Sequence, residues 1–242
     1  MMRLDAVRRL LESCPGEIES FLEIGPGLGD VAAHLLERYP QTNGELVEFS
    51  SVAAAHLVER FASCKRLKVS SSSFGEKPAQ EAHDLVLAFE VLEHIEDDCA
   101  ALAHIHTTLR PDGYFIMSVP AFMDKWERGD DWAGHYRRYE KDELRKKLSD
   151  IGFEILELWN SGFPLSGLLY PLRQLYYKFS RAADEGLSKE AASQQSGINR
   201  PFMLPGVAVW LVPLLWPFFG LQYHFRNTGF GDGWILLARK KA

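Results

Sequence analysis

The chain has 242 residues, of which 46 % are hydrophobic and 25 % charged, a composition typical of a globular protein with one sizeable domain. A formal net charge of −6 argues against a nucleic-acid partner, and three scattered cysteines without a CxxC pair argue against a disulfide framework or structural zinc. The cysteine pattern fits a reducing cytoplasm, and the N-terminal segment lacks the apolar core of a signal peptide, so we expect a cytoplasmic protein.

Strands and helices are predicted to alternate along most of the chain, after an amphipathic N-terminal helix. The predicted strands are Ser20–Ile24, Glu45–Phe49, Arg66–Val69, Ala82–Phe89, Tyr114–Val119, Phe153–Trp159 and Trp234–Ala238. The predicted helices between them are one reaching about Tyr39, then Ser51–Ser63, Asp97–Leu109 and Glu140–Ser149, with a turn at Arg110–Gly113. This alternation indicates an α/β fold with a mostly parallel sheet covered on both faces.

The stretch from Asn160 to Gly233 is too long for an ordinary connection and predicts a mostly helical insertion. Its polar part, Arg181–Asn199, is predicted to be a mobile loop. Pro201–Leu221 carries no charge, but four prolines make a buried or membrane-surface helical hairpin more plausible than a straight membrane span. The predicted organisation is therefore a core over 1–160, an insertion or lid over 161–232, and a last core strand over 233–242.

A glycine-rich loop follows the first predicted strand in the segment FLEIGPGLGD, Phe21–Asp30. The dinucleotide fingerprint G-x-G-x-x-G would need a third glycine where Asp30 stands, and no Lys-Ser or Lys-Thr of a phosphate-binding loop follows. Glu23 and Asp30 flank the glycines and would repel a pyrophosphate. The spacing and the charges therefore favour a cationic ligand without phosphate.

The segment Glu23–Gly29 resembles the first signature of class I S-adenosylmethionine-dependent methyltransferases. The resemblance implies a Rossmann-like, seven-stranded sheet with an antiparallel strand near its end, and S-adenosylmethionine as cofactor. It also implies that Glu23 faces the methionine amino group and that Glu48 binds the ribose, while Ser71 or Ser72 stands where relatives often carry an acid for the adenine. The expected cofactor residues are Glu23, Gly25, Gly27, Gly29, Glu48, Phe49, Ser71, Ser72, Phe89 and Glu90.

The segment FEVLEHIE, Phe89–Glu96, follows the fourth predicted strand and also resembles these methyltransferases. The resemblance places Glu90 near the transferred methyl group and makes His94 a candidate general base. Glu90, Glu93 and His94, with a later His135, also resemble the metal-binding E-x-x-E-H motif of ubiquinone-pathway and small-RNA methyltransferases. Many metal-free relatives carry the same segment, so we expect no metal and keep these four residues as the alternative.

The segment Ala121–Tyr139 contains GHYRRY and resembles the lid of many small-molecule methyltransferases. The predicted acceptor-binding residues are Trp126 and Trp132 as an apolar wall, His135 and Tyr136 as contacts, and Arg137 for an anionic group. His135 is a second candidate base. In the alternative interpretation, Arg137 and Arg138 pair with nearby acids such as Asp130 and Asp131.

These patterns predict methyl transfer to a small-molecule acceptor. The acceptor is expected to be hydrophobic or lipid-linked because of the apolar insertion, which is also a candidate for peripheral membrane contact or for a homodimer interface. The alternative function is a non-catalytic S-adenosylmethionine-binding sensor or partner subunit. The sequence leaves the acceptor atom and the acceptor itself open, since fold does not fix chemistry.

Overall fold

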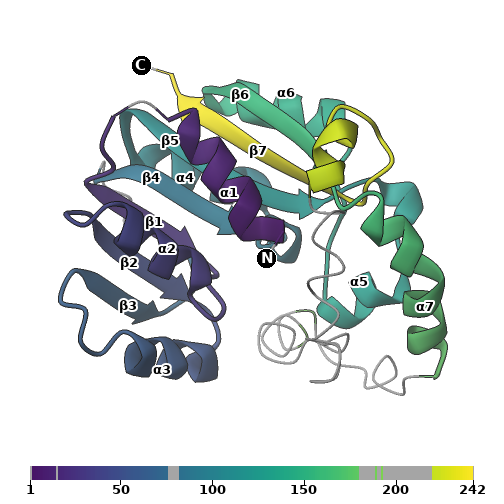
Figure 1. Cartoon of the computed structure of the whole chain (residues 1–242), viewed down its shortest axis with the longest axis horizontal. Helices are drawn as coiled ribbons and strands as arrows, with labels where there is room; N and C mark the ends of the chain where they lie inside the picture. The colour runs from purple at the N-terminus through teal and green to yellow at the C-terminus, as the bar shows by residue number, and fades with distance from the viewer. Residues whose placement is uncertain are drawn as a thin grey trace.

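The computed structural model describes residues 2–14, 16–75, 82–179, 189, 192 and 220–241 (Figure 1). Its strands are β1 Ser20–Ile24, β2 Asn43–Glu48, β3 Leu67–Ser71, β4 His83–Phe89, β5 Leu109–Pro120, β6 Phe153–Ser161 and β7 Gly233–Lys240. Its helices are α1 Met2–Glu12, α2 Asp30–Arg38, α3 Ser51–Arg60, α4 Asp98–Thr108, α5 Arg128–Ala133, α6 Lys141–Ile151 and α7 Leu165–Phe179. Short 3₁₀ turns are η1 Leu92–His94, η2 Met123–Lys125 and η5 Gln222–Phe225.

The seven strands form one sheet in the order β3-β2-β1-β4-β5-β7-β6. The first five strands in the chain pair in parallel with one another, and β7 is antiparallel to both β5 and β6. The predicted seven-stranded, mostly parallel sheet with an antiparallel strand is therefore confirmed. The strand order reverses direction at β1 and β4, and in such sheets ligands bind outside the carboxyl ends of the strands at that point.

Helices cover both faces of the sheet, as predicted (Figure 1). Alternate residues of each strand point to opposite faces, so Leu85 and Leu87 of β4 pack with α1, α2 and α3, whereas Val86 and Ala88 pack with α4 and α6. All four of these side chains are almost fully buried. Burial on both faces explains why the parallel strands read as continuous apolar runs in the sequence.

Residues 110–113 differ from their prediction as a turn. They lie inside β5, where the pairing with β4 moves from His83–Leu109 to Leu85–Tyr114, so the extra residues form a bulge. Asp112 adopts a φ of 60° in this bulge, a left-handed conformation that Asp tolerates better than most residues. The turn chemistry was recognised correctly, but here it bends a strand rather than ending one.

The segment between β6 and β7 contains α7 and η5 in its described part, which fits the predicted helical insertion. Most of Arg181–Asn199 and residues 201–219 of the uncharged stretch lie outside the described residues, so the loop and hairpin predictions remain predictions. Within the described ranges, no helix is long and apolar enough to cross a bilayer.

Candidate functional site

The glycine loop lies at the carboxyl end of β1, where the chain turns into α2. Gly25, Gly27 and Gly29 have φ values of 62°, 58° and 79°, a region that side chains with a Cβ rarely adopt. A Cβ on Gly25 would also lie 2.8 Å from a methyl carbon of Val91. The loop therefore needs glycine for its backbone conformation, and at Gly25 for close packing against the segment after β4.

Glu48 ties this loop to the end of β2. Its carboxylate accepts hydrogen bonds from the backbone N–H of Ser50, at 2.9 Å, and of Gly27, at 3.3 Å. Burial raises the pKa of Glu48, and these backbone hydrogen bonds only partly oppose the shift. The predicted ribose-binding acid therefore lies directly beside the predicted cofactor loop, and Glu23 is buried in β1 just before it.

The remaining predicted cofactor residues differ in how they face this edge. Ser71 pairs with Glu48 across β2 and β3 and is exposed, and Ser72 lies 3.3 Å from Ser70 between their hydroxyl oxygens. Phe49 is 43 % exposed at the end of β2, where its ring is available for stacking. The side chain of Phe89 is instead buried in the core, so only its backbone remains to contact a ligand.

A cavity of about 170 Å³ opens at the carboxyl ends of β4 and β5. Glu90 lines it and adopts a φ of 56°, which is strained for a glutamate and typical of functional sites. The Ser118 hydroxyl donates a 2.6 Å hydrogen bond to the Glu90 carboxylate. Asn160, Gln222 and Tyr223 complete much of the polar wall.

Sequence reasoning missed Ser118, Asn160 and Gln222. The first two are polar residues near the ends of strands, β5 and β6, and that position is the signal that could have identified them. Gln222 offered no such signal, because η5 reaches the cavity from far along the chain.

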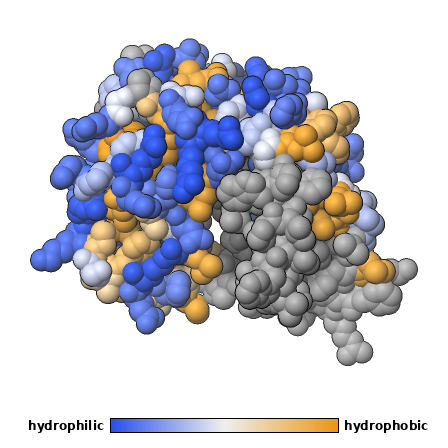
Figure 2. All heavy atoms as spheres, in the orientation of Figure 1, coloured by the Kyte–Doolittle hydropathy of each residue, from blue (hydrophilic) through white to orange (hydrophobic). Residues whose placement is uncertain are grey.

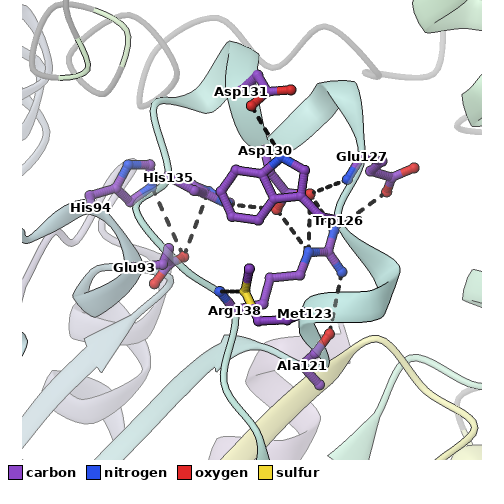
Figure 3. A network of polar contacts seen from close by, with 10 residues as sticks. All are labelled: Glu93, His94, Ala121, Met123, Trp126, Glu127, Asp130, Asp131, His135 and Arg138. Carbon is purple, nitrogen blue, oxygen red and sulfur yellow. Dashed lines mark hydrogen bonds and ion pairs between the residues drawn. The ribbon is translucent and has the colours of Figure 1, made fainter.

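Glu93, His94 and His135 converge beside η1 (Figure 3). The Nε2 atoms of His94 and His135 each lie 4.0 Å from the same carboxylate oxygen of Glu93, and the two rings meet edge to face at 4.6 Å. Burial, together with the neighbouring His135, lowers the pKa of His94 to about 3, so His94 is neutral at physiological pH. Glu90 of the four-residue alternative does not belong to this described group.

Asp130 holds His135 from the opposite side. Its carboxylate lies 2.8 Å from the Nδ1 of His135 and accepts two hydrogen bonds from the Nε of Arg138 and one from its Nη2. Burial raises the pKa of Asp130, but the hydrogen bonds from His135 and Arg138 outweigh burial and hold it below the ordinary value. Figure 3 shows how Arg138 also reaches the carbonyl of Ala121, which links α5 to the end of β5.

The other predicted lid residues have partners within the protein. Trp126 donates to Asp131 at 3.1 Å, and Tyr136 donates its backbone N–H to the Glu93 carbonyl at 2.8 Å. Arg137 pairs with Asp98 at 2.7 Å and also donates to the carbonyl of Glu96. Trp132 is half-buried in α5. Both arginines therefore pair with acids, as in the alternative interpretation. Arg137 pairs mainly with Asp98, and Arg138 pairs mainly with Asp130.

Comparisons with known proteins identify the family of this chain. A family model described as a methyltransferase domain matches residues 3–158. A probable S-adenosylmethionine-dependent methyltransferase of Mycolicibacterium smegmatis is 28 % identical over 152 residues, which cover 61 % of this chain and 56 % of that protein. A related protein of Mycobacterium tuberculosis with the same description is 30 % identical over 44 % of this chain and 39 % of its own length. The matches thus span about half or less of these curated relatives.

Solved structures share the fold at low sequence identity. A phosphoethanolamine N-methyltransferase of Haemonchus contortus, in complex with S-adenosylmethionine, superposes with a TM-score of 0.64 and 16 % identity over 98 % of this chain and 52 % of that one. An N-methyltransferase of Burkholderia thailandensis with bound S-adenosylhomocysteine superposes with a TM-score of 0.58 and 18 % identity. The match covers 100 % of this chain and 78 % of that one. The loop, the sheet and the family match together establish that this chain belongs to the methyltransferase-domain family, with the class I fold and S-adenosylmethionine as cofactor.

Proposed function

We propose that this chain transfers the methyl group of S-adenosylmethionine to a small-molecule acceptor bound in the cavity beside Glu90. The observation that carries the proposal is that Glu90 and Ser118, at the carboxyl ends of β4 and β5, line this cavity, and β4 lies beside β1, the strand that leads into the glycine loop. Ligands of open α/β sheets bind at this edge. Cofactor and acceptor would thus occupy adjacent parts of one edge.

The proposed cofactor site uses the glycine loop for close approach and Glu48 for the ribose hydroxyls. Glu23 would face the methionine amino group. Phe49, Ser71 and Ser72 would surround the adenine, and Phe89 would contribute its backbone. The support is that the loop and Glu48 already contact one another in the structure, so the two halves of this site are positioned before ligand binds.

In the proposed reaction, a nucleophile of the acceptor attacks the sulfonium methyl carbon in line. One bond forms to the methyl carbon, the carbon–sulfur bond breaks, and S-adenosylhomocysteine leaves with the electron pair. Because the donor is already activated, the protein mainly supplies orientation and a dry site. Glu90 in the cavity wall would receive the acceptor's donor group. His135 remains the candidate for taking a proton if one must leave, whereas the low pKa of His94, the other predicted base, makes it a poor proton acceptor near neutral pH.

We also propose that the acceptor carries an apolar portion. Phe163, Phe225 and Phe230 form an aromatic cluster with ring centroids 4.7 to 6.5 Å apart. Phe163 and Phe225 are adjacent in sequence to the cavity residues Gly162 and Arg226. Phe230 is 62 % exposed, which costs free energy unless a ligand or another surface covers it. The predicted roles of Pro201–Leu221 in membrane contact or dimerisation are separate expectations.

The experiment is a methyl-transfer assay with a series of acceptors that share one headgroup and differ in alkyl length. We expect turnover with isolated small molecules and a KM that falls as the alkyl chain grows. Phe230→Ala should flatten that dependence, whereas the control Val58→Ala, an exposed apolar residue of α3, should leave it unchanged. A KM independent of chain length contradicts the apolar acceptor. S-adenosylmethionine binding without turnover on any acceptor favours the sensor alternative.

A further inference from the structure

We propose that Glu93, His94 and His135 form a binding site for a divalent transition-metal ion of the zinc type. One potential ligand atom from each of the three side chains lies within 4.8 Å of those of the other two. Two imidazoles and one carboxylate are a donor set that suits zinc and its first-row neighbours better than magnesium, which prefers oxygen ligands. The site differs from the four-residue alternative because Glu90 faces Ser118 and the cavity instead.

The distances are close to those of a coordinated site. Ligands at about 2.0–2.2 Å from a tetrahedral ion would be roughly 3.3–3.6 Å apart. The two imidazole Nε2 atoms each lie 4.0 Å from the Glu93 oxygen, and all the potential ligand atoms of the group lie within 4.8 Å of one another. Side-chain movements of up to about 1 Å would therefore complete the arrangement. Three protein ligands would leave a fourth position open, as in catalytic zinc sites.

The surroundings of the histidines supply a second, independent observation. Metal-binding histidines usually donate their other ring nitrogen to a carboxylate, which fixes the tautomer and the ring orientation. His135 has this arrangement, because its Nδ1 faces Asp130 while its Nε2 faces Glu93. Asp130 is only 2 % exposed and is held in turn by Arg138, so His135 has a rigid support.

An ion has access to this position. The side chains of His94 and His135 retain 16 % and 13 % of their exposure, whereas that of Glu93 is fully buried. Solvent therefore reaches the group through its two imidazoles. Glu93 follows the cavity residue Glu90 by three positions, so their Cα atoms are at most about 11 Å apart. A bound ion would therefore lie near the proposed acceptor cavity.

The site has a consequence for the roles proposed above for the two histidines. As ligands, His94 and His135 would hold the ion rather than act as free bases, and the open coordination position would take an acceptor oxygen or a water. Binding of the ion itself does not depend on the identity of the acceptor, so it is testable without any acceptor.

The test is metal binding by the purified full chain after treatment with chelator. Cobalt(II), a spectroscopic substitute for zinc, should bind in a saturable manner at one ion per chain, give the visible absorption bands of a low-coordinate site, and be displaced by zinc. Glu93→Gln and His135→Ala should abolish these bands. Asp130→Asn should weaken zinc binding by about 10- to 100-fold, because it supports His135 without touching the ion.

The matched control is His56→Ala, which removes an exposed histidine from α3 and should leave binding unchanged. Binding of S-adenosylhomocysteine reports that each variant is folded. Wild-type protein that binds neither cobalt nor zinc overturns the proposal, as does binding that persists unchanged in both Glu93→Gln and His135→Ala. Either result concerns metal binding alone, which is measured without an acceptor. It is therefore distinguishable from failure of the proposed function, which is measured as methyl transfer.

Discussion

The cofactor side and the acceptor side of the carboxyl edge of the sheet differ in the sequence separation of the residues that contact each other there. On the cofactor side, the hydrogen bond from Gly27 to Glu48 joins residues only 21 positions apart. On the acceptor side, Asn160 contacts Gly231 across 71 positions, and Tyr223 contacts Asp5 across 218. A short local motif can specify the first site, whereas the second exists only after the last strand and α1 have packed onto the sheet.

Figure 2 shows one face of the molecule, on which hydrophilic and apolar side chains are mixed over the half that carries β1 to β4. Apolar side chains are also exposed on α7. Leu168 and Leu175 of α7 are 61 % and 53 % exposed. The comparison therefore predicts that changes in the cofactor half alter S-adenosylhomocysteine binding, and that changes in the other half alter stability or acceptor use.

The largest effect is expected for Gly25→Ala. The new Cβ would meet Val91 at 2.8 Å on a backbone with a φ of 62°, and overpacking of this kind costs about 1–3 kcal/mol. Affinity for S-adenosylhomocysteine, measured by calorimetry, should fall by about 10- to 100-fold. Gly16→Ala is the control, because it has a comparable φ of 97° but open space around its Cβ. Equal losses of affinity in both variants would contradict the close-approach role of Gly25.

The next effect is a loss of stability in Asp98→Asn. The buried Asp98 carboxylate receives hydrogen bonds from Tyr139 and Lys147 and pairs with Arg137, joining α4 to the lid and α6. Hydrogen bonds to charged groups contribute about 1.5–3 kcal/mol each, so the free energy of unfolding at pH 7 should fall by about 2 kcal/mol. Asp150→Asn, which removes an exposed ion pair with Lys146, should change it far less.

This stabilisation should depend on pH in one direction. Burial raises the pKa of Asp98, but the hydrogen bonds from Lys147 and Tyr139 outweigh burial and hold it below the ordinary value of 3.8. A depressed pKa gives stability that is fully present above that value and is lost as the pH falls through the lower folded pKa. Urea unfolding should therefore show the gap between wild type and Asp98→Asn shrinking below about pH 3.8. A difference in unfolding free energy between the two proteins that does not change with pH would contradict the depressed pKa of Asp98.

A smaller effect is expected for Ser118→Ala. The variant loses the 2.6 Å hydrogen bond that orients Glu90 in the cavity, which corresponds to about 1 kcal/mol. We expect kcat/KM to fall by about 5-fold with unchanged affinity for S-adenosylhomocysteine. Ser149→Ala, on the exposed side of α6, is the control. Weaker binding of S-adenosylhomocysteine by Ser118→Ala would contradict the comparison, because it would show that a change on the acceptor side also alters the cofactor side.

The sequence predicted the sheet well, for physical reasons that particular residues illustrate, and it singled out the glycine loop and Glu48, which contact each other at one edge of that sheet. Strands such as β4 are buried on both faces and therefore appear as apolar runs. The glycine loop was recognisable because its conformation permits only one residue type at several close positions. The resemblance to class I methyltransferases rested on this loop and on the segment after β4.

The acceptor side could not be predicted to the same extent. His94 and His135 were singled out, but the support of His135 by Asp130 depends on the short helix α5, which places the Asp130 carboxylate 2.8 Å from the Nδ1 of His135. Gln222 lies in η5, which reaches the cavity from far along the chain and shows no local signal of a site. Arg137 had an acid partner that lies 39 positions earlier, Asp98, which spacing alone cannot identify.

The most direct test of the central claim is a calorimetric titration with S-adenosylhomocysteine and, separately, with NAD. The account predicts one saturable site for S-adenosylhomocysteine, no binding of NAD, and an affinity about 10-fold lower in Glu48→Gln, since the charged acceptor facing the loop is lost. Glu59→Gln on α3 should bind as wild type does. Binding of NAD in place of S-adenosylhomocysteine, or an affinity unchanged by Glu48→Gln, would contradict the assignment of this edge to the methyl donor.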